Sequence, residues 1–370
     1  MQVAVFTHSL SSCWNHGNAH FLRGVLRELQ NMGHTVRAWE PEGSWSRENL
    51  LRDGGQAGAA VFSEHYPELE AGFYPPGTPD LDSMLDGADL VLVHEWNPPE
   101  LVAAIGRRRL QGGRFLLLFH DTHHRAVSDP GAIRHFDLSG YDGVLAFGAT
   151  LARVYERWGW QGRVFVWHEA ADLRRFHPPE QPVSRAGAVW IGNWGDDERS
   201  AELETFLLRP MREAGLPLDI YGVRYPEAAK ATLARHGARL RGWLPNPRAP
   251  EVFARHLVTV HVPRRYYVTL LPGIPTIRVF EALACGIPLL SAPWDDAEGL
   301  FRQGEDYLIA RDGSDMTRLL REIAHDPARR DALAQHGLET IRARHSCAHR
   351  ARELLAIAET LHPSLNKMPA

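Results

Sequence analysis

Thr276-Ile-Arg-Val-Phe-Glu-Ala-Leu-Ala-Cys-Gly-Ile-Pro-Leu-Leu-Ser291 is the stretch that decides the fold of this chain. It predicts a helix that begins near Thr276 and ends at Gly286, followed at once by a strand over residues 288–291. Ala282 and Ala284 are small, so this helix can lie close against a sheet. A helix that passes directly into a strand is typical of an α/β unit.

Strand-like segments alternate with helical patterns on both sides of this stretch. The expected strands cover residues 3–7, 35–39, 89–94, 114–120, 143–147, 163–167, 188–191, 217–221, 257–262, 288–291 and 307–309. Residues 18–32 carry apolar side chains at helical spacing, as do later segments between the strands. Strands separated by helices pair in parallel, so we expect two Rossmann-like, doubly wound α/β domains facing each other across a cleft.

Composition also divides the chain. Residues 172–185 are polar and rich in proline, which is typical of a linker. We therefore expect an N-terminal domain at 1–171, a linker at 172–185 and a C-terminal domain at 186–345. A last helix at 346–362 is expected to cross back to the N-terminal domain.

Charge and hydropathy exclude several classes of protein. The formal net charge of the 370 residues is −4, without the basic excess of a nucleic-acid binder, so no nucleic-acid partner is expected. The longest apolar run, residues 115–119, is too short to span a bilayer, so we expect no integral membrane segment. Three cysteines without a pairing pattern or metal-ligand spacing favour a reducing, cytoplasmic location.

The start of the quoted helix has the chemistry of an anion site. Backbone N–H groups at Thr276, Ile277 and Arg278 are unpaired at a helix N-terminus, and the positive dipole end there suits a pyrophosphate. Glu281 lies one turn further along the helix, where its carboxylate can accept both hydroxyls of a ribose. The alternative is a helix whose Glu281 merely faces solvent.

Arg278-Val-Phe-Glu-Ala-Leu-Ala-Cys-Gly-Ile-Pro-Leu-Leu290 resembles the Glu-Ala-Met-Ala-Cys-Gly-x-Pro-Val-Ile signature of retaining GT-B glycosyltransferases. Its Arg-x-Phe-Glu start is similar to that of the CgeB-like, spore-maturation-protein type. The resemblance implies the GT-B fold, with an acceptor-side N-terminal domain and a C-terminal domain that binds a nucleotide-sugar donor. Glu281 would hold the ribose and Arg278 the phosphates, with no metal and no cofactor besides a UDP- or dTDP-sugar co-substrate.

One position departs from this pattern. Many members of the wider clan carry another glutamate eight positions before the ribose-binding one, where it contacts the donor sugar. This chain has Gly273 at that position. We therefore expect the sugar to be recognised differently, by the backbone N–H groups of Gly273 and Ile274.

Gly192-Asn-Trp-Gly-Asp-Asp-Glu-Arg199 resembles the family's Gly-Asn-x-x-x-x-x-Arg loop, which approaches the diphosphate. Gly192 and Asn193 would allow close backbone approach, and Arg199 would stabilise the leaving phosphate with a forked hydrogen-bond pair. Alternatively, Arg199 pairs at the surface with Asp196 or Glu202.

A further segment, Arg241-Gly-Trp-Leu-Pro245, resembles the Gly-x-Leu segment whose backbone reads the nucleobase. Trp243 and Leu244 are therefore candidate contacts of the base. Packing of Trp243 in the core is an equal alternative.

The loop after the first strand, residues 8–17, lacks the Gly-x-Gly-x-x-Gly fingerprint of a dehydrogenase. In the resembling family this loop faces the donor phosphates and the acceptor, so Gly17 and Asn18 are candidate contacts. Helix capping is the alternative role for these residues.

His120 and Asp121 end another expected strand, where catalytic groups of such sheets gather. They resemble a His-Asp pair of the same family, in which the histidine approaches the donor sugar. We therefore expect His120 to be catalytic, together with Arg199, and Asp121 to bind substrate. A metal site that adds His123 and His124 is the competing interpretation, although the spacing fits no defined zinc pattern.

The sequence therefore predicts a glycosyltransferase that moves a sugar from a nucleotide-diphosphate sugar to a hydroxyl of a small-molecule or glycan acceptor. A non-hydrolysing nucleotide-sugar epimerase shares this architecture and is one alternative. A degenerate, non-catalytic sugar or nucleotide binder is another, because Gly273 replaces the expected glutamate. A scaffold protein would instead expose a large apolar face.

Overall fold

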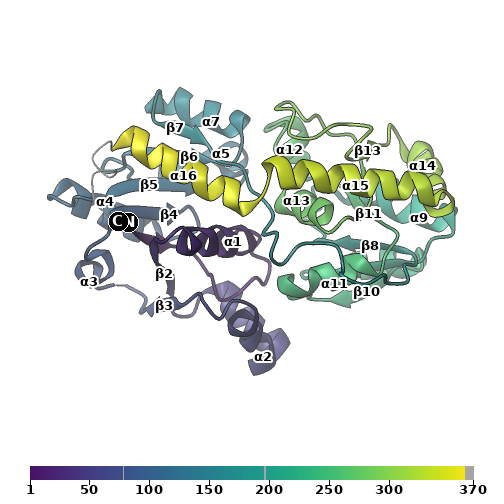
Figure 1. The fold of residues 1–370 in the computed structure, drawn as a ribbon, viewed down its shortest axis with the longest axis horizontal. Coiled ribbons are helices and arrows are strands. Elements are labelled where there is room, and N and C mark those ends of the chain that lie inside the picture. The colour runs from purple at the N-terminus through teal and green to yellow at the C-terminus, as the bar shows by residue number, and fades with distance from the viewer. Residues whose placement is uncertain (78, 196, 363–370) are drawn as a thin grey trace. The chain divides into compact units, whose positions relative to one another are not determined.

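The protein, described over residues 1–77, 79–195 and 197–362 by a computed structural model, divides into two compact units (Figure 1). The first unit comprises Met1–Glu169 and resumes at Cys347, while the second comprises Ala170–Ser346. Residues 172–185, which we expected to be a linker, belong to the second unit, where Phe176 is buried in an apolar cluster.

The first unit is built on a seven-stranded parallel sheet in the order β3-β2-β1-β4-β5-β6-β7. The strands are β1 (Gln2–Phe6), β2 (Thr35–Pro41), β3 (Ala71–Tyr74), β4 (Leu90–His94), β5 (Leu116–Asp121), β6 (Gly143–Ala146) and β7 (Val164–Val166). β4 and β5 are buried along their whole length, as expected for parallel strands covered on both faces. Strand order reverses between β1 and β4, and ligands of α/β sheets bind beside the carboxyl ends at such a point.

Helices connect these strands, and the last helix of the chain completes the unit. They are α1 (Asn18–Asn31), α2 (Trp45–His65), α3 (Leu81–Leu85), α4 (Pro99–Leu110), α5 (Arg125–Ser128), α6 (Pro130–Arg134), α7 (Ala149–Tyr155), the π-helical turn η1 (Glu156–Trp160) and α16 (Cys347–Leu361). α16 lies beside α1 (Figure 1). The indole Nε1 of Trp167 donates a 2.9 Å hydrogen bond to the carbonyl of Arg350, which fixes α16 to the end of the sheet.

The second unit repeats this plan with a six-stranded parallel sheet in the order β10-β9-β8-β11-β12-β13. Its strands are β8 (Ala188–Ile191), β9 (Leu218–Tyr221), β10 (Arg239–Gly242), β11 (Val258–His261), β12 (Leu289–Ser291) and β13 (Leu308–Ile309). The order reverses between β8 and β11, which places a second switch point there.

The helices of the second unit begin with a broken helix and end with two long ones. They are α8 (Ser200–Leu203), the π-helical turn η2 (Glu204–Leu208), α9 (Arg209–Ala214), α10 (Glu227–Arg235), the 3₁₀ turn η3 (Asn246–Arg248), α11 (Ala249–Ala254), α12 (Arg265–Thr269), α13 (Ile277–Ala284), α14 (Gly313–His325) and α15 (Pro327–Arg344). Asp312 and Asp326 cap α14 and α15 by accepting hydrogen bonds from first-turn N–H groups, which favours helix formation there.

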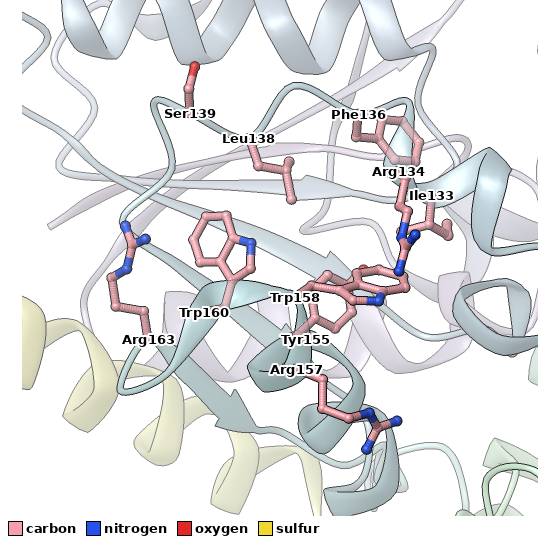
Figure 2. A pocket seen from close by; sticks show the side chains of 10 residues that line it. All are labelled: Ile133, Arg134, Phe136, Leu138, Ser139, Tyr155, Arg157, Trp158, Trp160 and Arg163. Atoms are coloured by element: carbon pink, nitrogen blue, oxygen red, sulfur yellow. The ribbon is translucent and has the colours of Figure 1, made fainter.

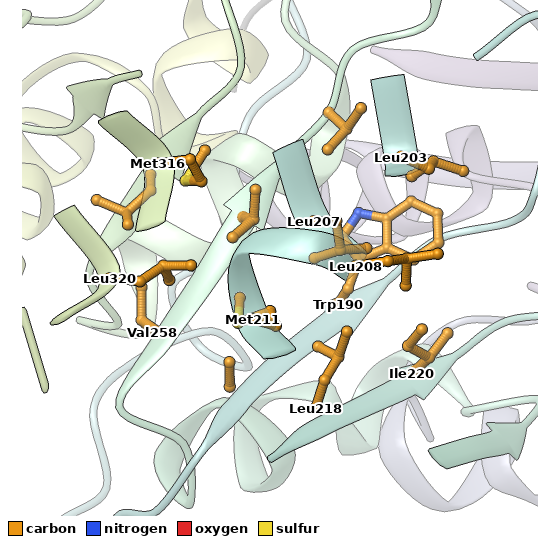
Figure 3. Packing of buried hydrophobic residues seen from close by; sticks show 14 of the residues in the cluster. Trp190, Leu203, Leu207, Leu208, Met211, Leu218, Ile220, Val258, Met316 and Leu320 are labelled. Atoms are coloured by element: carbon orange, nitrogen blue, oxygen red, sulfur yellow. The ribbon is translucent and has the colours of Figure 1, made fainter. Parts of the chain in front are cut away.

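One apolar cluster of the second unit lies between the sheet and the helices α8 to α9 and α14 (Figure 3). Figure 3 shows Trp190 of β8 among the leucines of the broken helix, with Leu218 and Ile220 of β9 below it. Burial of such side chains is worth about 25 cal/mol per Å² of apolar surface removed from water. This packing holds β8 and the loop that follows it in place.

The expected α/β class with two parallel sheets is confirmed, but the sequence did not reveal every element. β3 and β10 are edge strands, and β3 contains Gly72, which weakens a strand pattern. α2 was missed because Gly54 and Gly55 interrupt its sequence, and Gly55 has a positive φ of 58° inside it. The loop 263–275 contains the short helix α12.

Candidate functional site

A cavity of about 180 Å³ opens in the second unit beside the carboxyl ends of β8 and β11 and the start of α13. Five residues singled out from the sequence line it, namely Gly192, Arg199, Thr276, Ile277 and Arg278. This is the switch point of the second sheet, so its position agrees with the general rule for ligand sites in such folds.

Arg199 supplies an enclosed positive charge to this cavity. Its Nη1 donates to the carbonyl of Val262 at 2.9 Å, Nη2 donates to the carbonyl of Asn193, and Nε donates to that of Trp194 at 3.4 Å. Burial lowers the pKa of Arg199 to about 10, so the guanidinium remains protonated near neutral pH. Its partners are thus neutral carbonyls, and the charge itself has no counterion in direct contact among the described residues.

The carboxylates near Arg199 are engaged with other arginines. Glu198 pairs with Arg264 at 2.5 Å, and Glu202 pairs with Arg265 at 3.0 Å. The alternative in which Arg199 pairs with Glu202 at the surface is therefore not found, and Asp196 lies outside the described residues. An enclosed cation whose direct partners are all neutral acceptors is costly to desolvate, and a bound anion would offset that cost.

The start of α13 adds polar groups to the same cavity. Thr276 is the N-cap residue, but its side chain makes no capping hydrogen bond, unlike the aspartates before α14 and α15. The N-terminal dipole of α13 therefore faces the cavity without a protein carboxylate on it. His261 also lines the cavity, and burial together with Arg199 lowers its pKa to about 3, so this imidazole is neutral.

Glu281 lies at the centre of a buried polar network. Its side chain is 1 % exposed and accepts hydrogen bonds from Asn246 Nδ2 at 2.8 Å and from Arg278 Nη1 at 2.5 Å. Arg278, which we expected to reach the phosphates, is thus tied to Glu281 one turn away. The solvent-facing alternative for Glu281 is wrong. Asn246 was not expected, although an Asn-Pro pair after a strand is a common turn signal.

Gly273 has a backbone that only glycine adopts readily. Its φ is 92°, and an added Cβ would lie 3.0 Å from the Cβ of Ala297 and 3.2 Å from its backbone nitrogen. A glutamate at this position would therefore be strained, so the loop itself differs from one that carries a sugar-binding carboxylate. The neighbouring Ile274 is buried as a whole residue, and neither Gly273 nor Ile274 is among the residues that line the cavity.

Among the remaining candidates of the second unit, Gly192, Asn193 and Leu244 make structural contacts, whereas Trp243 has an enclosed polar atom without a partner among the described residues. An added Cβ at Gly192 would lie 2.8 Å from the ring of Trp190, which explains the glycine by packing. Asn193 Oδ1 accepts from the backbone N–H of Val223 at 2.8 Å and so fixes the loop after β8. Leu244 packs on the apolar cluster. The indole Nε1 of Trp243 is enclosed without a hydrogen-bond partner among the described residues.

Four histidines form a row in the first unit at the carboxyl ends of its central strands. His8 follows β1, His16 precedes α1, and His94 and His120 end β4 and β5. Successive ring centroids lie 5.4, 5.9 and 5.4 Å apart along the row. The packing of His120 against Trp167, with centroids 4.8 Å apart, closes one end of the row.

All four imidazoles are neutral at physiological pH. Burial lowers the pKa of His8 to about 4 and that of His120 to about 3. Burial and neighbouring imidazoles hold the pKa values of His16 and His94 well below the ordinary range. The Nε2 atoms of His8, His16 and His120 are enclosed without a partner in the described part of the chain. Enclosed polar atoms without protein partners are rare because they cost free energy, so these atoms are candidate contacts for a ligand or for ordered water.

Asn18 belongs with this row. It is the first residue of α1, and neither its Oδ1 nor its Nδ2 has a hydrogen-bond partner within residues 1–77, 79–195 and 197–362 although both are enclosed. Gly17 precedes the helix and contributes backbone only. Sequence reasoning placed Asn18 and His120 separately. Adjacent pairing of β1, β4 and β5 is what brings them together.

The carboxylate of Asp121 is engaged in hydrogen bonds with protein groups. Its carboxylate accepts from the Tyr155 hydroxyl at 2.7 Å and from the backbone N–H of His123 at 3.0 Å, and burial raises its pKa to about 6. Beside it, burial and Asp121 raise the pKa of Glu95 well above its ordinary range. Arg125 pairs with Glu95 at 3.2 Å. Across the described residues, no group of three or more His, Cys, Asp or Glu side chains has the arrangement of a metal site.

Comparisons with known proteins agree with this geometry. Residues 199–356, which include Arg199, Arg278 and Glu281, match the protein family described as glycosyl transferase-like. No curated protein matches the chain by sequence. The described part of the chain contains no helix with the length and apolar character needed to cross a bilayer.

Solved structures resemble the chain over nearly its full length. Sucrose-phosphate synthase from Thermosynechococcus elongatus has a TM-score of 0.68 at 14% identity, covering 98% of this chain and 100% of its own. Anabaena HepE in complex with UDP-glucose has a TM-score of 0.68 at 12% identity, covering 100% of both chains. A DNA-modifying β-glucosyltransferase has a TM-score of 0.60 at 12% identity, covering 98% of this chain and 99% of its own.

At these identities the likeness to solved structures establishes the fold and no more. The two parallel sheets, each with a switch point, are those of the GT-B glycosyltransferases, so the expected fold is confirmed. The CgeB-like type remains a prediction. The chain has the GT-B fold, and its residues 199–356 match the glycosyl transferase-like family.

Proposed function

We propose that this protein is a retaining, metal-independent glycosyltransferase that transfers a sugar from a nucleotide-diphosphate sugar to a hydroxyl of a small-molecule or glycan acceptor. The observation that carries the proposal is Arg199, an enclosed cation whose partners are neutral carbonyls and which lines a cavity at the start of α13. A leaving nucleoside diphosphate gathers negative charge as the glycosidic bond breaks. An enclosed guanidinium and a helix N-terminus stabilise such charge without reorganising.

We assign each part of the donor to residues of the second unit. The diphosphate lies between Arg199 and the first turn of α13, where it takes the position of the missing counterion. Glu281, oriented by Asn246 and Arg278, accepts the ribose hydroxyls. Trp243 offers its enclosed Nε1–H to an oxygen of the base. Uridine is the favoured base, because fold neighbours were solved with UDP-glucose.

The sugar and the acceptor are assigned to the neutral row of the first unit. His120 and Asn18 present enclosed polar atoms that can exchange hydrogen bonds with sugar hydroxyls. Neutral imidazoles do not compete with Arg199 for the diphosphate. The departing phosphate takes the proton of the attacking hydroxyl, so retention needs no separate general base. Arg199 and the α13 dipole supply the positive charge that divalent metals supply in other transferases. We further propose a cytoplasmic location, since all three cysteines are thiols.

A thermal-shift panel with UDP, dTDP, GDP and their sugars tests the donor site. A ligand that binds only the folded state raises stability, by about 2.7 kcal/mol at one hundred times its Kd. We expect UDP and UDP-sugars to raise the melting temperature of the wild type and of Arg265→Ala, whose side chain is outside the cavity. Arg199→Ala should abolish the shift. Silence of the wild type across the whole panel would contradict the proposal.

Product analysis separates this function from the two alternatives. A transferase releases UDP slowly from its donor through hydrolysis and faster when an acceptor is added. An epimerase would instead interconvert UDP-sugars without releasing UDP. A non-catalytic binder would give a thermal shift but no UDP, and no difference in turnover between the wild type and Arg199→Ala.

A further inference from the structure

A second cavity, of about 530 Å³, lies in the first unit and is lined by other residues than the histidine row (Figure 2). It is formed by the end of α6, the loop that follows, the end of α7 and the π-helical turn η1. Ligand pockets in proteins measure about 300–1,000 Å³, so this one is large enough for a specific ligand. The donor site described above makes no use of it.

All charged side chains that line this cavity are positive. Arg134, Arg157 and Arg163 line it, and no carboxylate is among its lining residues. In the described part of the chain none of the three forms an ion pair. Arg108 and Arg109 of the same unit, in contrast, pair with Asp82 and Asp142. Three unneutralised guanidinium groups at one pocket, on a chain of net charge −4, fit an anionic ligand.

Two tryptophans give the cavity flat apolar walls. The guanidinium of Arg134 lies 5.0 Å from the ring centroid of Trp158, and that of Arg163 lies 4.4 Å from that of Trp160. Figure 2 shows Trp160 between Arg163 on one side and Trp158 with Arg134 on the other. Each aromatic plane therefore adjoins a fork of donors that matches a carboxylate or a sulfate.

The backbone of η1 brings the two tryptophans to one pocket. Residues two positions apart on a regular helix do not face each other. Gly159, between them, has a φ of 99°, which breaks the helix and lets both indoles line the same cavity. Both indoles remain partly exposed, so they are accessible to a ligand.

We infer that this pocket binds an acidic segment of a glycan, with pyranose C–H faces on Trp158 and Trp160 and the anionic groups on the three arginines. Carboxylate and sulfate groups share this chemistry. The inference rests on the proposed function, since a glycan bound here is the acceptor or its extension. A nucleic acid is less suited, because it needs a basic strip longer than one pocket.

Calorimetric titration of the full chain tests the pocket with four defined probes. These are tetragalacturonate, a sulfated heparin-derived tetrasaccharide, neutral cellotetraose and a short oligothymidylate. We expect at least one acidic tetrasaccharide to bind about tenfold or more tighter than cellotetraose, and added salt to weaken it. The arm that binds identifies carboxylate or sulfate as the recognised group.

Substitutions in the pocket test whether the acidic probe binds there. Arg157→Ala combined with Arg163→Ala should weaken the acidic probe at least about tenfold, and so should Trp160→Ala. Arg153→Ala is the matched control, because this exposed arginine lies one turn before Arg157 but does not line the cavity. Binding of UDP, measured alongside, should be unchanged in every variant.

Several results would overturn the inference. One is that neither acidic tetrasaccharide binds. Another is that oligothymidylate binds as tightly as the acidic tetrasaccharide and that the double variant abolishes this binding. The third is that Arg153→Ala weakens the acidic probe as much as the double variant does. If the acidic probes fail while UDP binds, the pocket is wrong and the proposed function stands. If an acidic probe binds while UDP does not, the proposed donor site fails and the pocket stands.

Discussion

The polar sites of the two units differ in charge although their sheets follow the same plan. In the second unit, the cavity beside β8 and β11 is lined by a protonated, enclosed Arg199 and by Arg278, which pairs with the buried Glu281. In the first unit, the corresponding strand ends carry imidazoles whose pKa values lie far below neutrality. One plan thus provides a charged cavity in the second unit and an uncharged row of polar side chains in the first.

The largest expected effect is on the affinity of the second unit for UDP. Glu281→Ala leaves the partly buried Arg278 without its carboxylate and removes the proposed acceptor of the ribose hydroxyls. We expect UDP affinity to fall by at least about a hundredfold, because loss of one partner of a buried charge pair costs about 2–5 kcal/mol. Isothermal calorimetry measures the change.

Two further variants decide whether that loss is local. Glu281→Gln keeps the shape of the side chain and should still lose most of the affinity. Glu202→Ala removes an exposed pair with Arg265 and should leave UDP binding as in the wild type. Unchanged affinity in Glu281→Gln would show that the carboxylate does not hold the ribose.

The neutral histidines of the first unit predict that the free energy of unfolding depends on pH. The folded pKa of His120, about 3, lies below its ordinary value of 6.5, so its contribution is present above pH 6.5 and is lost as pH falls toward 3. Between pH 7 and pH 5 the wild type should lose about 2 kcal/mol more unfolding free energy than His120→Asn. Urea titration at each pH measures the difference.

Asp121 and His135 provide the controls. The folded pKa of Asp121, about 6, lies above its ordinary value, so its contribution has the opposite sign and is lost as pH rises. Asp121→Asn should therefore gain stability relative to the wild type between pH 4 and pH 7. His135 is exposed, and His135→Asn should follow the wild type. A His120→Asn variant as sensitive to acid as the wild type would mean that His120 is not neutral in the native state.

Asn18 separates a ligand role from a structural one. Its amide has no protein partner within the described residues, so Asn18→Ala breaks no intramolecular hydrogen bond and should not lower the unfolding free energy by more than about 0.5 kcal/mol. We expect kcat/KM for the UDP-sugar to fall about tenfold. Asn31→Ala, at the exposed end of the same helix, is the control. Full activity of Asn18→Ala would remove this residue from the proposed sugar site.

Gly273 tests how closely the loop before α13 is packed in the second unit. Gly273→Ala should lose about 1–2 kcal/mol of stability through its positive φ and the contact with Ala297. Gly237→Ala has a similar φ of 69° but open space, so it should cost less. Equal costs would mean that Ala297 does not restrict this loop.

The fold, and several of the residues that line the cavity of the second unit, could be predicted from local pattern. The stretch from Thr276 to Ser291 carries a helix start, small residues and a strand within one short segment, so α13 and β12 were expected at nearly their true bounds. The Arg199 loop was found by a motif. Its enclosure was not predicted, because that depends on Val262 of a distant strand end.

The histidine row could not be read from the sequence. His8, His16, His94 and His120 are far apart in the chain, and each alone is as compatible with capping or packing as with ligand binding. Strand order makes them neighbours, and their low pKa values follow from burial that no local pattern reveals. Asn246 was missed for the same reason, since its partner Glu281 lies in another element.

The attachment of α16 to α1 also fixes the order in which the chain can mature. A ribosome delivers the whole second unit, Ala170–Ser346, before it delivers the helix that completes the first. The unit with the histidine row therefore acquires this supporting helix only after the whole second unit has been made, although most of its own residues emerge first. A nascent chain halted near Ser346 would carry every residue of the second unit but lack the helix that completes the first.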